Sequence, residues 1–331
     1  MSYWNYIPGA AAGGAEANIF CLFGFLEDAA SPGFVANIDK YDPDANTWTA
    51  KTAASITACN LGTAVGIAGV VYAQGGRDSD GHKHHAGYTI SSDSWGNLTQ
   101  FADENYKRSH GKMNGDYYMT GGKAYGAIDG ARSTHKTYDI HKYSVSGDSW
   151  SDTGINASHL MAAMPSGVID RDSTSAKWFM VNDNVDGGGG ANNGATDKYT
   201  LATNTITVMT SLYSLRYWVG GDGRSAGFTA GGNLYMHNGW DAPEHSLSMS
   251  NQVRGYSVSG DSWSVKTDTN NEKVDIGGAS LDADGDTGYS IAGDNNDYSG
   301  PKVEKYSVSG NSWTNVADLT YEPQHSLGAS A

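Results

Sequence analysis

One pattern recurs along the whole chain: a tyrosine followed, seven positions later, by a tryptophan. Five copies are complete, and one further copy, YTLATNTI, the fourth along the chain, keeps Tyr199 but has Ile206 in place of the tryptophan. The complete copies pair Tyr41 with Trp48, Tyr88 with Trp95, Tyr143 with Trp150, Tyr256 with Trp263, and Tyr306 with Trp313. Successive tyrosines lie 47 to 57 residues apart, and self-similarity at such a period indicates a repeat architecture. We therefore expect six similar structural units.

Each unit should contain four β-strands. The tyrosine and tryptophan flank a polar tetrad, such as SGDS or PDAN, that suits a tight turn, so the third and fourth strands should form a hairpin. An apolar run before each hairpin predicts the second strand, and a Gly- and Ala-rich segment before that run predicts the first. The apolar runs cover residues 18–24, 70–76, 116–122, 177–183, 233–239 and 288–294.

Six such sheets can bury both of their faces only when they are arranged radially. The sequence therefore predicts an all-β, six-bladed β-propeller with four-stranded antiparallel blades. The blades should cover about residues 9–50, 61–98, 109–153, 165–209, 224–266 and 276–316 of a single domain spanning 1–331. The repeated tyrosines and tryptophans then belong in the core between blades rather than on a sugar-stacking surface.

The repeats resemble those of the Kelch family, which carry a double glycine after the second strand and a spaced Tyr and Trp in the third and fourth. Gly75 with Gly76 and Gly121 with Gly122 match the double glycine, and the other four units depart from it. The resemblance covers nearly the whole chain and implies a propeller. Residues 8–17 and residues 317–331 both have the small side chains that the innermost strand of the first blade needs, so either end could close the ring.

Charge and composition argue against several classes of function. A formal net charge of −15 repels a phosphate backbone over most of the surface, so nucleic acid is not an expected partner. Neither a bilayer-spanning apolar run nor a Sec-type signal peptide is recognisable, so membrane insertion is not expected. Cys21 and Cys59 should be buried thiols, with a disulfide as the alternative. The Gly-, Ser-, Asn- and Tyr-rich composition predicts an extracellular or virion-associated protein, with the cytoplasm as second choice.

Two clusters have residue types that bind metals. His82, His84 and His85 in GHKHH could supply imidazole ligands, but the spacing of a zinc site is missing, and we expect surface histidines in a solvated loop. Asp282, Asp284 and Asp286 alternate as in calcium loops, but Thr287 replaces the expected glycine. A plain turn explains this segment as well, so calcium is the one cofactor that stays open, and no other cofactor is expected.

No catalytic residue is predicted. The signature turns of sialidases are missing, Cys21 is badly placed for the Cys-linked tyrosine of galactose-oxidase-like enzymes, and no nucleophile elbow occurs. The variable loops therefore predict a non-enzymatic binding or assembly module whose partner is a protein or a surface glycan, as a homo-oligomer, a virion component or a host-attachment component. The alternative is a secreted carbohydrate-active enzyme of propeller type, sialidase-like or galactose-oxidase-like. The loop residues expected to bind are Arg77, His82, His84, His85, Tyr125, Trp240 and Tyr298.

Overall fold

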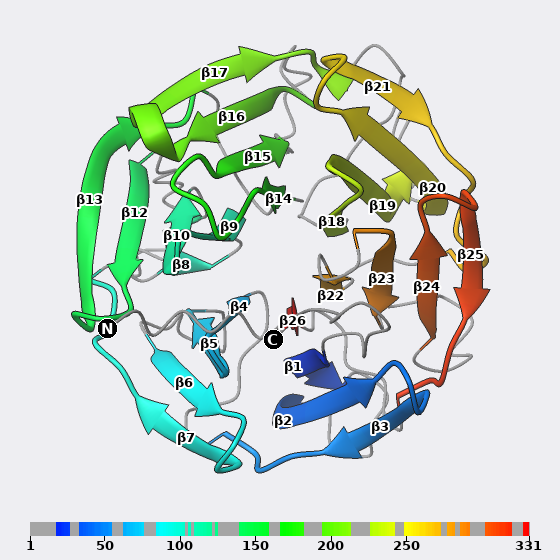
Figure 1. The fold of residues 1–331 in the computed structure, drawn as a ribbon. Helices are drawn as coiled ribbons and strands as arrows, with labels where there is room; N and C mark the ends of the chain where they lie inside the picture. The colour runs from blue at the N-terminus through cyan, green and yellow to red at the C-terminus, as the bar shows by residue number, and fades with distance from the viewer. Residues whose placement is uncertain are drawn as a thin grey trace, which may run out of the picture.

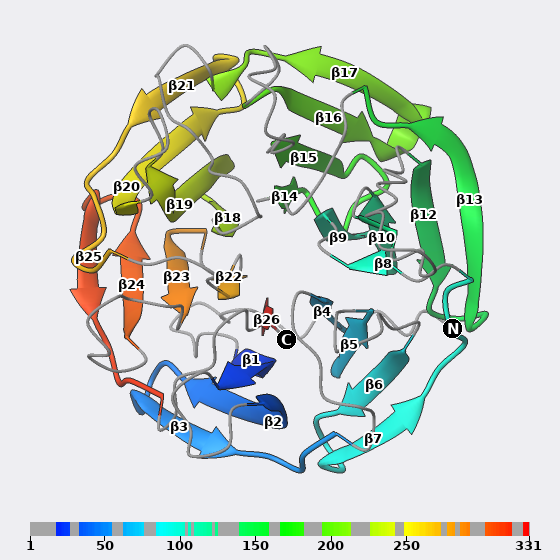
Figure 2. The ribbon, with the colours of Figure 1, turned by 180° about the vertical axis from the view of Figure 1, so that it is seen from behind.

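The computed structural model is a ring of six antiparallel sheets around a central axis (Figures 1 and 2). Each of these six sheets has four strands, so the predicted all-β six-bladed propeller is confirmed. The structure describes residues 18–26, 33–54, 62–75, 84–102, 105–106, 109–120, 123–124, 139–158, 166–181, 194–212, 226–241, 248–272, 277–281, 285–291, 302–319 and 327–330. Within these ranges, no helix has the length and apolar character that crossing a membrane requires.

The strands follow one another outward from the axis in every blade. Blade 1 contains β26 (Leu327–Ser330), β1 (Ile19–Leu26), β2 (Gly33–Asp42) and β3 (Thr47–Ala50). Blade 2 contains β4 (Thr63–Ile67), β5 (Val70–Gln74), β6 (His85–Thr89) and β7 (Ser94–Asn97). Blade 3 contains β9 (Ser109–Met113), β10 (Asp116–Thr120), β12 (Asp139–Ser144) and β13 (Ser149–Asn156), beside a small ribbon of β8 (Asn105–Tyr106) and β11 (Lys123–Ala124).

The other three blades have the same order. Blade 4 contains β14 (Ser166–Ile169), β15 (Lys177–Val181), β16 (Thr196–Thr200) and β17 (Thr205–Met209), with a 3₁₀ turn, η1 (Leu201–Thr203), in its hairpin. Blade 5 contains β18 (Ala226–Ala230), β19 (Asn233–Asp241), β20 (Ser248–Ser257) and β21 (Ser262–Val265). Blade 6 contains β22 (Gly277–Leu281), β23 (Thr287–Ile291), β24 (Val303–Ser307) and β25 (Ser312–Asn315).

The C-terminal strand closes the ring. β26 pairs antiparallel with β1, with Leu327 opposite Leu22 and Ser330 opposite Ile19, and it is the innermost strand of blade 1. The first and last strands that the structure describes, β1 and β26, therefore share one sheet. Of the two closing segments that the sequence left open, the one from residues 317–331 occupies this place. The innermost strand of blade 1 is thus β26, and residues 9–17 of the predicted blade lie outside the described residues.

The repeated hairpin has one geometry in all six blades. Each repeat tyrosine pairs across the hairpin with the residue seven positions later, as Tyr41 does with Trp48 and Tyr199 does with Ile206. The fifth residue after the tyrosine has a positive φ of 42° to 51°, a conformation that Asn and Asp tolerate best among non-glycine residues. Its side-chain oxygen accepts a hydrogen bond of 2.6 to 2.9 Å from the tyrosine hydroxyl. The six acceptors are Asn46, Asp93, Asp148, Asn204, Asp261 and Asn311.

The same hairpins join each blade to the blade before it. At the junction of blades 1 and 2, the backbone N–H of Thr52 donates to Asp93 and the Thr52 carbonyl accepts from Trp95 Nε1, at 2.9 and 2.8 Å. We call this pair of bonds to one residue the inter-blade clamp. The clamp is complete at five junctions, where it holds Thr52, Thr99, Thr210, Thr267 and Ala317. The two hydrogen bonds of each clamp thus restrain the orientation of a blade relative to the preceding blade.

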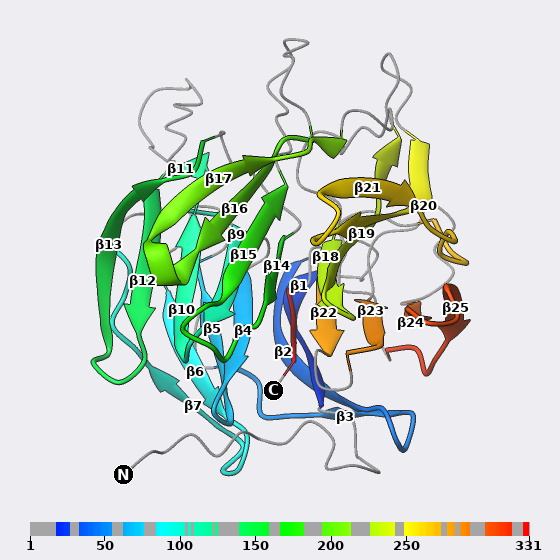
Figure 3. The same ribbon diagram turned by 45° about the horizontal axis from the view of Figure 1, so that its top comes forward.

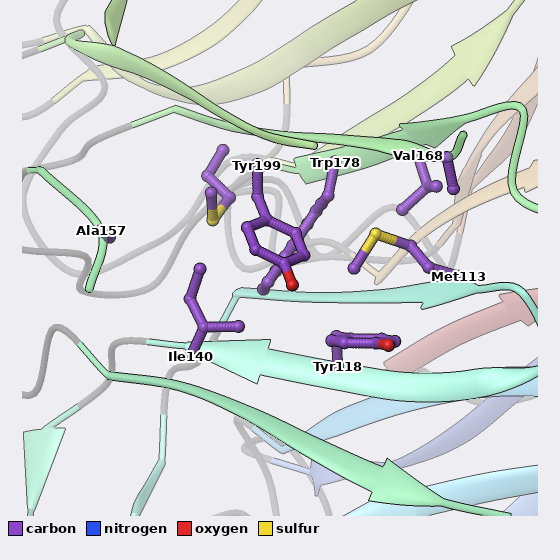
Figure 4. Packing of buried hydrophobic residues seen from close by; sticks show 9 residues of the cluster. Met113, Tyr118, Ile140, Ala157, Val168, Trp178 and Tyr199 are labelled. Carbon is purple, nitrogen blue, oxygen red and sulfur yellow. The ribbon is translucent and has the colours of Figure 1, made fainter. Parts of the chain in front are cut away.

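The junction of blades 3 and 4 lacks a complete clamp. Ile206 stands where the tryptophan would be, and the bond described there runs from Asn204 Nδ2 to the Thr153 carbonyl at 3.3 Å. A hydrophobic cluster lies between these two blades, as at the other junctions, and includes Tyr118, Ile140, Trp178 and Tyr199 (Figure 4). This junction therefore combines apolar burial with fewer directed hydrogen bonds than a complete clamp provides.

Candidate functional site

The connections between strands are unequal on the two sides of the ring. Because successive strands are antiparallel, the second strand of every blade ends, and its third strand begins, on the same side of the ring, which we call the loop side (Figure 3). The links between second and third strands range from residues 27–32 in blade 1 to residues 121–138 in blade 3. The links between first and second strands leave on the opposite side, and the hairpin turns of the clamps lie at the perimeter. The loop side is thus where blades differ most.

The residues at the loop end of each sheet also differ between blades. Three residues, one from each of the first three strands, pair side by side where the second strand reaches the loop side, and we call them the end row. The apolar members from the second and third strands pack against the next blade. In blade 1 the end row is Leu327, Leu22 and Ile38, and in blade 6 it is Gly277, Ile291 and Val303. The fold therefore accepts an entirely non-polar end row.

The end row of blade 2 is polar, in contrast to the non-polar end rows of blades 1 and 6. Its end row is Thr63, Gln74 and His85, which pair in register across β4, β5 and β6. Their exposed fractions are 1, 2 and 2 %. Blades 3, 4 and 5 each keep an apolar member in this row: Ile140, Val181 and Val253. Blade 2 is consequently the blade whose end row is polar at all three positions.

Aromatic and imidazole rings of blade 3 cover this polar row. The Thr63 hydroxyl makes a hydrogen bond with the hydroxyl of Tyr117, which is fully buried in β10. The His85 ring lies edge-on to Tyr143 at 4.4 Å and 5.2 Å from Trp150. The ring centroids of His85 and His110 lie 6.3 and 6.4 Å from that of Tyr117, in a tilted and an edge-on arrangement. Threonine, glutamine, tyrosine and two histidines thus converge between blades 2 and 3.

His110 is a further departure from the repeat. The equivalent residues of the other first strands are Gly328, Ala64, Ser166, Gly227 and Gly278, which are all small. Innermost strands lie close to the axis, where small residues are expected. An imidazole at this position therefore adds a polar group that the architecture itself does not require.

His85 is held in one tautomer. Its Nδ1 lies 3.0 Å from the Thr99 carbonyl, which can only accept, so Nδ1 carries the proton and Nε2 is an acceptor. Burial lowers the pKa of His85 to about 4, while the bond to Thr99 and the negative charge of Asp148 only partly oppose this shift. The ring is neutral at neutral pH, and its buried Nε2 has no hydrogen-bond partner.

Gln74 is the second buried group with unused hydrogen-bonding capacity. Neither its Oε1 nor its Nε2 has a partner, and an unpaired buried polar group costs about 1–3 kcal/mol. The polar members of two other end rows are bonded: Thr120 donates to the Asp139 carbonyl at 2.9 Å, and His237 Nδ1 lies 2.8 Å from Asn238 Oδ1. Trp178, Thr196 and Asn271 each leave one buried atom unpaired, whereas Gln74 and His85 leave three atoms on neighbouring residues.

The structure corrects the sequence-based expectation for His85. It is not a solvated loop histidine but the first residue of β6, and it is buried because it packs under Trp150 of blade 3. His84, just before the strand, is half-buried, and its carbonyl accepts from the Gly75 N–H at 2.7 Å. Trp240 lies in β19, opposite Met249. Arg77, His82, Tyr125 and Tyr298 lie outside the described residues.

Of the three aspartates considered as calcium ligands, the structure describes Asp286. Asp286, just before β23, is bonded to the β24–β25 hairpin of the same blade: its carboxylate accepts from the Ser309 N–H at 2.8 Å, from Ser309 Oγ at 3.0 Å and from Ser307 Oγ at 3.1 Å. Burial opposes ionisation here, but these three bonds outweigh it and lower the pKa of Asp286. Asp282 and Asp284 lie outside the described residues. Within the described ranges, no three His, Cys, Asp or Glu side chains converge as a metal site.

Several residues of the polar cluster were not predicted from the sequence: Thr63, Gln74, His110 and Tyr117. Each is ordinary by itself, and only its place in the repeat makes it unusual. Alignment of the six second strands would have put Gln74 beside Leu22, Val181 and Ile291, because these residues hold the same register position. That comparison requires the exact strand register, which the structure supplies.

Comparisons with known proteins support the architecture alone. No protein-family model matches the sequence. No curated protein matches it either. Among solved structures, the one described as "Structure of YjhT" superposes with a TM-score of 0.63 at 15 % identity, covering 90 % of this chain and 97 % of that one. The chain is therefore similar in fold to YjhT over nearly its full length, and membership of the Kelch family stays a prediction.

Proposed function

We propose that the protein is a non-enzymatic binding module that presents its loop side to a protein or glycan partner. The observation that carries this proposal is the contrast between two parts of one repeat. The hairpins of the clamps are nearly identical in all blades, while the connections and end rows on the loop side differ in length and polarity. A repeat that varies at one side of a constant scaffold is the usual arrangement of a recognition surface.

The shifted titrations of the scaffold fit a structural role. Tyr88, Tyr143 and Tyr256 have raised pKa values because they are buried and bonded to an Asp of their own hairpin. Those Asp side chains have lowered pKa values, first because the tyrosine hydroxyl donates to them. The shifted titrations of these tyrosines and aspartates are thus explained by the hairpins and clamps.

A neutral-glycan array run together with a hydrolysis assay tests the proposal. We expect saturable binding without product, reduced by Trp240→Ala on the loop-side part of β19 and unchanged by Ser259→Ala in the exposed hairpin of blade 5. For a protein partner, the same two variants are compared by size-exclusion chromatography with the purified candidate. Turnover of any glycan would replace the proposal by the alternative, a carbohydrate-active enzyme. Binding that is lost only in Ser259→Ala would place recognition at the perimeter hairpins instead of the loop side and would contradict the proposal.

The setting is part of the proposal. We infer an extracellular or particle-surface role, such as a virion structural or attachment component, in which the acidic ring presents its loops outward. The support is compositional: many Gly, Ser, Asn and Tyr residues and few Lys. Mass spectrometry of purified particles from the source would detect the chain if this is correct. Its absence from particles would remove the virion role but leave the binding module intact.

A further inference from the structure

The end row of blade 2 keeps polar groups that the fold could replace. Blade 1 puts Leu22 and Ile38 at the two positions where blade 2 has Gln74 and His85, and both pairs face the following blade. Each buried polar atom without a partner costs about 1–3 kcal/mol. A row that is expensive for stability and dispensable for architecture is therefore best explained by what it can bind.

The unused atoms define the chemistry of their ligand. His85 Nε2 is an acceptor, because Nδ1 carries the proton toward Thr99. Gln74 has a free acceptor, Oε1, and a free donor, Nε2. A hydroxyl group can donate to one of these acceptors and accept from the amide at the same time. It matches the pair without bringing a charge into a buried site.

Charged ligands fit this place poorly. The charged group that acts on His85 is Asp148, and this carboxylate already accepts from the Tyr143 hydroxyl at 2.6 Å and from the Thr99 N–H at 2.8 Å. The end row itself is Thr63, Gln74 and a neutral His85. An anion would meet no cation in this row, and burial of an unpaired charge is costly.

We propose that Gln74 and His85 form a subsite for a hydroxyl group of a neutral sugar, entered from the loop side between blades 2 and 3. The hydroxyl donates to His85 Nε2 and accepts from Gln74 Nε2, while the Thr63–Tyr117 hydrogen bond and the His110 ring border the same junction. This inference rests on the proposed function, because it names the ligand class of the same loop side. It assigns binding to residues that the variable loops alone did not indicate.

Paired replacement separates a binding role from a structural one. The double variant Gln74→Leu/His85→Ile gives blade 2 the second- and third-strand pair of blade 1. The matched control is Thr120→Val, the equivalent second-strand residue of blade 3, whose hydroxyl is already bonded to the Asp139 carbonyl. Ligand-observed NMR titrations use glucose, galactose and mannose as probes, with glucuronate as a charged comparator. Thermal unfolding is measured on the same samples.

We expect the wild-type protein to bind at least one of the neutral sugars and to bind glucuronate no more tightly than glucose. The double variant should bind that sugar about tenfold more weakly or not at all, because the two lost hydrogen bonds contribute about that factor. Its unfolding temperature should stay the same or rise, and Thr120→Val should keep its affinity. Gln74→Met, which preserves volume while removing both amide atoms, provides the same test should the double variant fail to fold.

Unchanged sugar affinity in the double variant, together with a lower unfolding temperature, would show that the row is structural and would overturn the inference. A crystal structure with sugar present but only a water between Gln74 and His85 would do the same. A wild-type protein that binds a protein partner and no neutral sugar would remove the subsite while the proposed function stands. Absence of both glycan and protein binding would remove both.

Discussion

Lowering the pH should reduce the free energy of unfolding over a pH range that the titration of His85 determines. Burial lowers its pKa to about 4 in the folded chain from the ordinary histidine value of 6.5, so between these two pH values the unfolded chain binds a proton that the folded chain does not. Stability associated with this residue is therefore complete above pH 6.5 and is lost as the pH falls toward 4. At 1.36 kcal/mol per pKa unit, the loss amounts to about 3 kcal/mol of unfolding free energy.

The perturbation that isolates this effect is His85→Ile, which introduces the residue found at the same position in blades 1 and 3. Urea unfolding followed by tryptophan fluorescence at pH 7.5, 6, 5 and 4.5 gives the unfolding free energy of both proteins. Comparison of their pH slopes cancels the contribution of the other histidines. The clamp aspartates have lowered pKa values and keep their charge through most of this window.

We expect the wild-type protein to lose stability relative to His85→Ile progressively below pH 6.5, by about 2–3 kcal/mol at pH 4.5. Equal slopes for the two proteins would mean that His85 titrates normally in the folded state. The ring would then be solvated rather than packed between Tyr143 and Trp150, and both the burial and the tautomer argued above would be wrong.

Three further predictions concern the scaffold. Asp261→Ala should lower the unfolding free energy by about 2 kcal/mol, since it removes the acceptor of Tyr256 and places a non-glycine residue without a side-chain cap at a positive φ, while Asp261→Asn should be nearly neutral in thermal unfolding. Ile206→Trp should supply the missing indole donor toward Thr153 and slow hydrogen exchange at the junction of blades 3 and 4, and faster exchange there would refute the clamp. Deletion of residues 327–331 should leave β1 an unpaired inner edge and cause aggregation or a large fall in melting temperature; an unchanged melting temperature would contradict closure by β26.

The repeat made most of the fold predictable. Five Tyr–Trp pairs and one Tyr–Ile pair at nearly constant spacing define six hairpins, because each Tyr must face the residue seven positions later for the turn to close, and the registers agree. Ring closure was not predictable, because segments rich in small residues occur at both ends. Two second strands also run past their expected ends, to Leu26 and Asp241, because a register shift in each lets pairing resume beyond it.

The site was less predictable than the fold for a physical reason. Histidines in GHKHH suggest a solvated loop, but the strand β6 begins at His85 and turns this ring toward blade 3. Gln74 gives no sign of importance in the sequence, because its burial depends on the register of three strands and on a neighbouring blade. Local patterns predict secondary structure, whereas an unpaired buried amide appears only after the sheets are packed.

Hydrogen–deuterium exchange with and without a bound neutral sugar tests the central claim most directly, because it reports every blade in one experiment. The account predicts added protection in peptides covering 63–75, 84–89 and 109–120, on the two blades that carry Gln74, His85, His110 and Tyr117, with no change in the hairpins at 258–261 and 308–311. Protection centred on those hairpins, or spread evenly over all six blades, would contradict recognition on the loop side between blades 2 and 3.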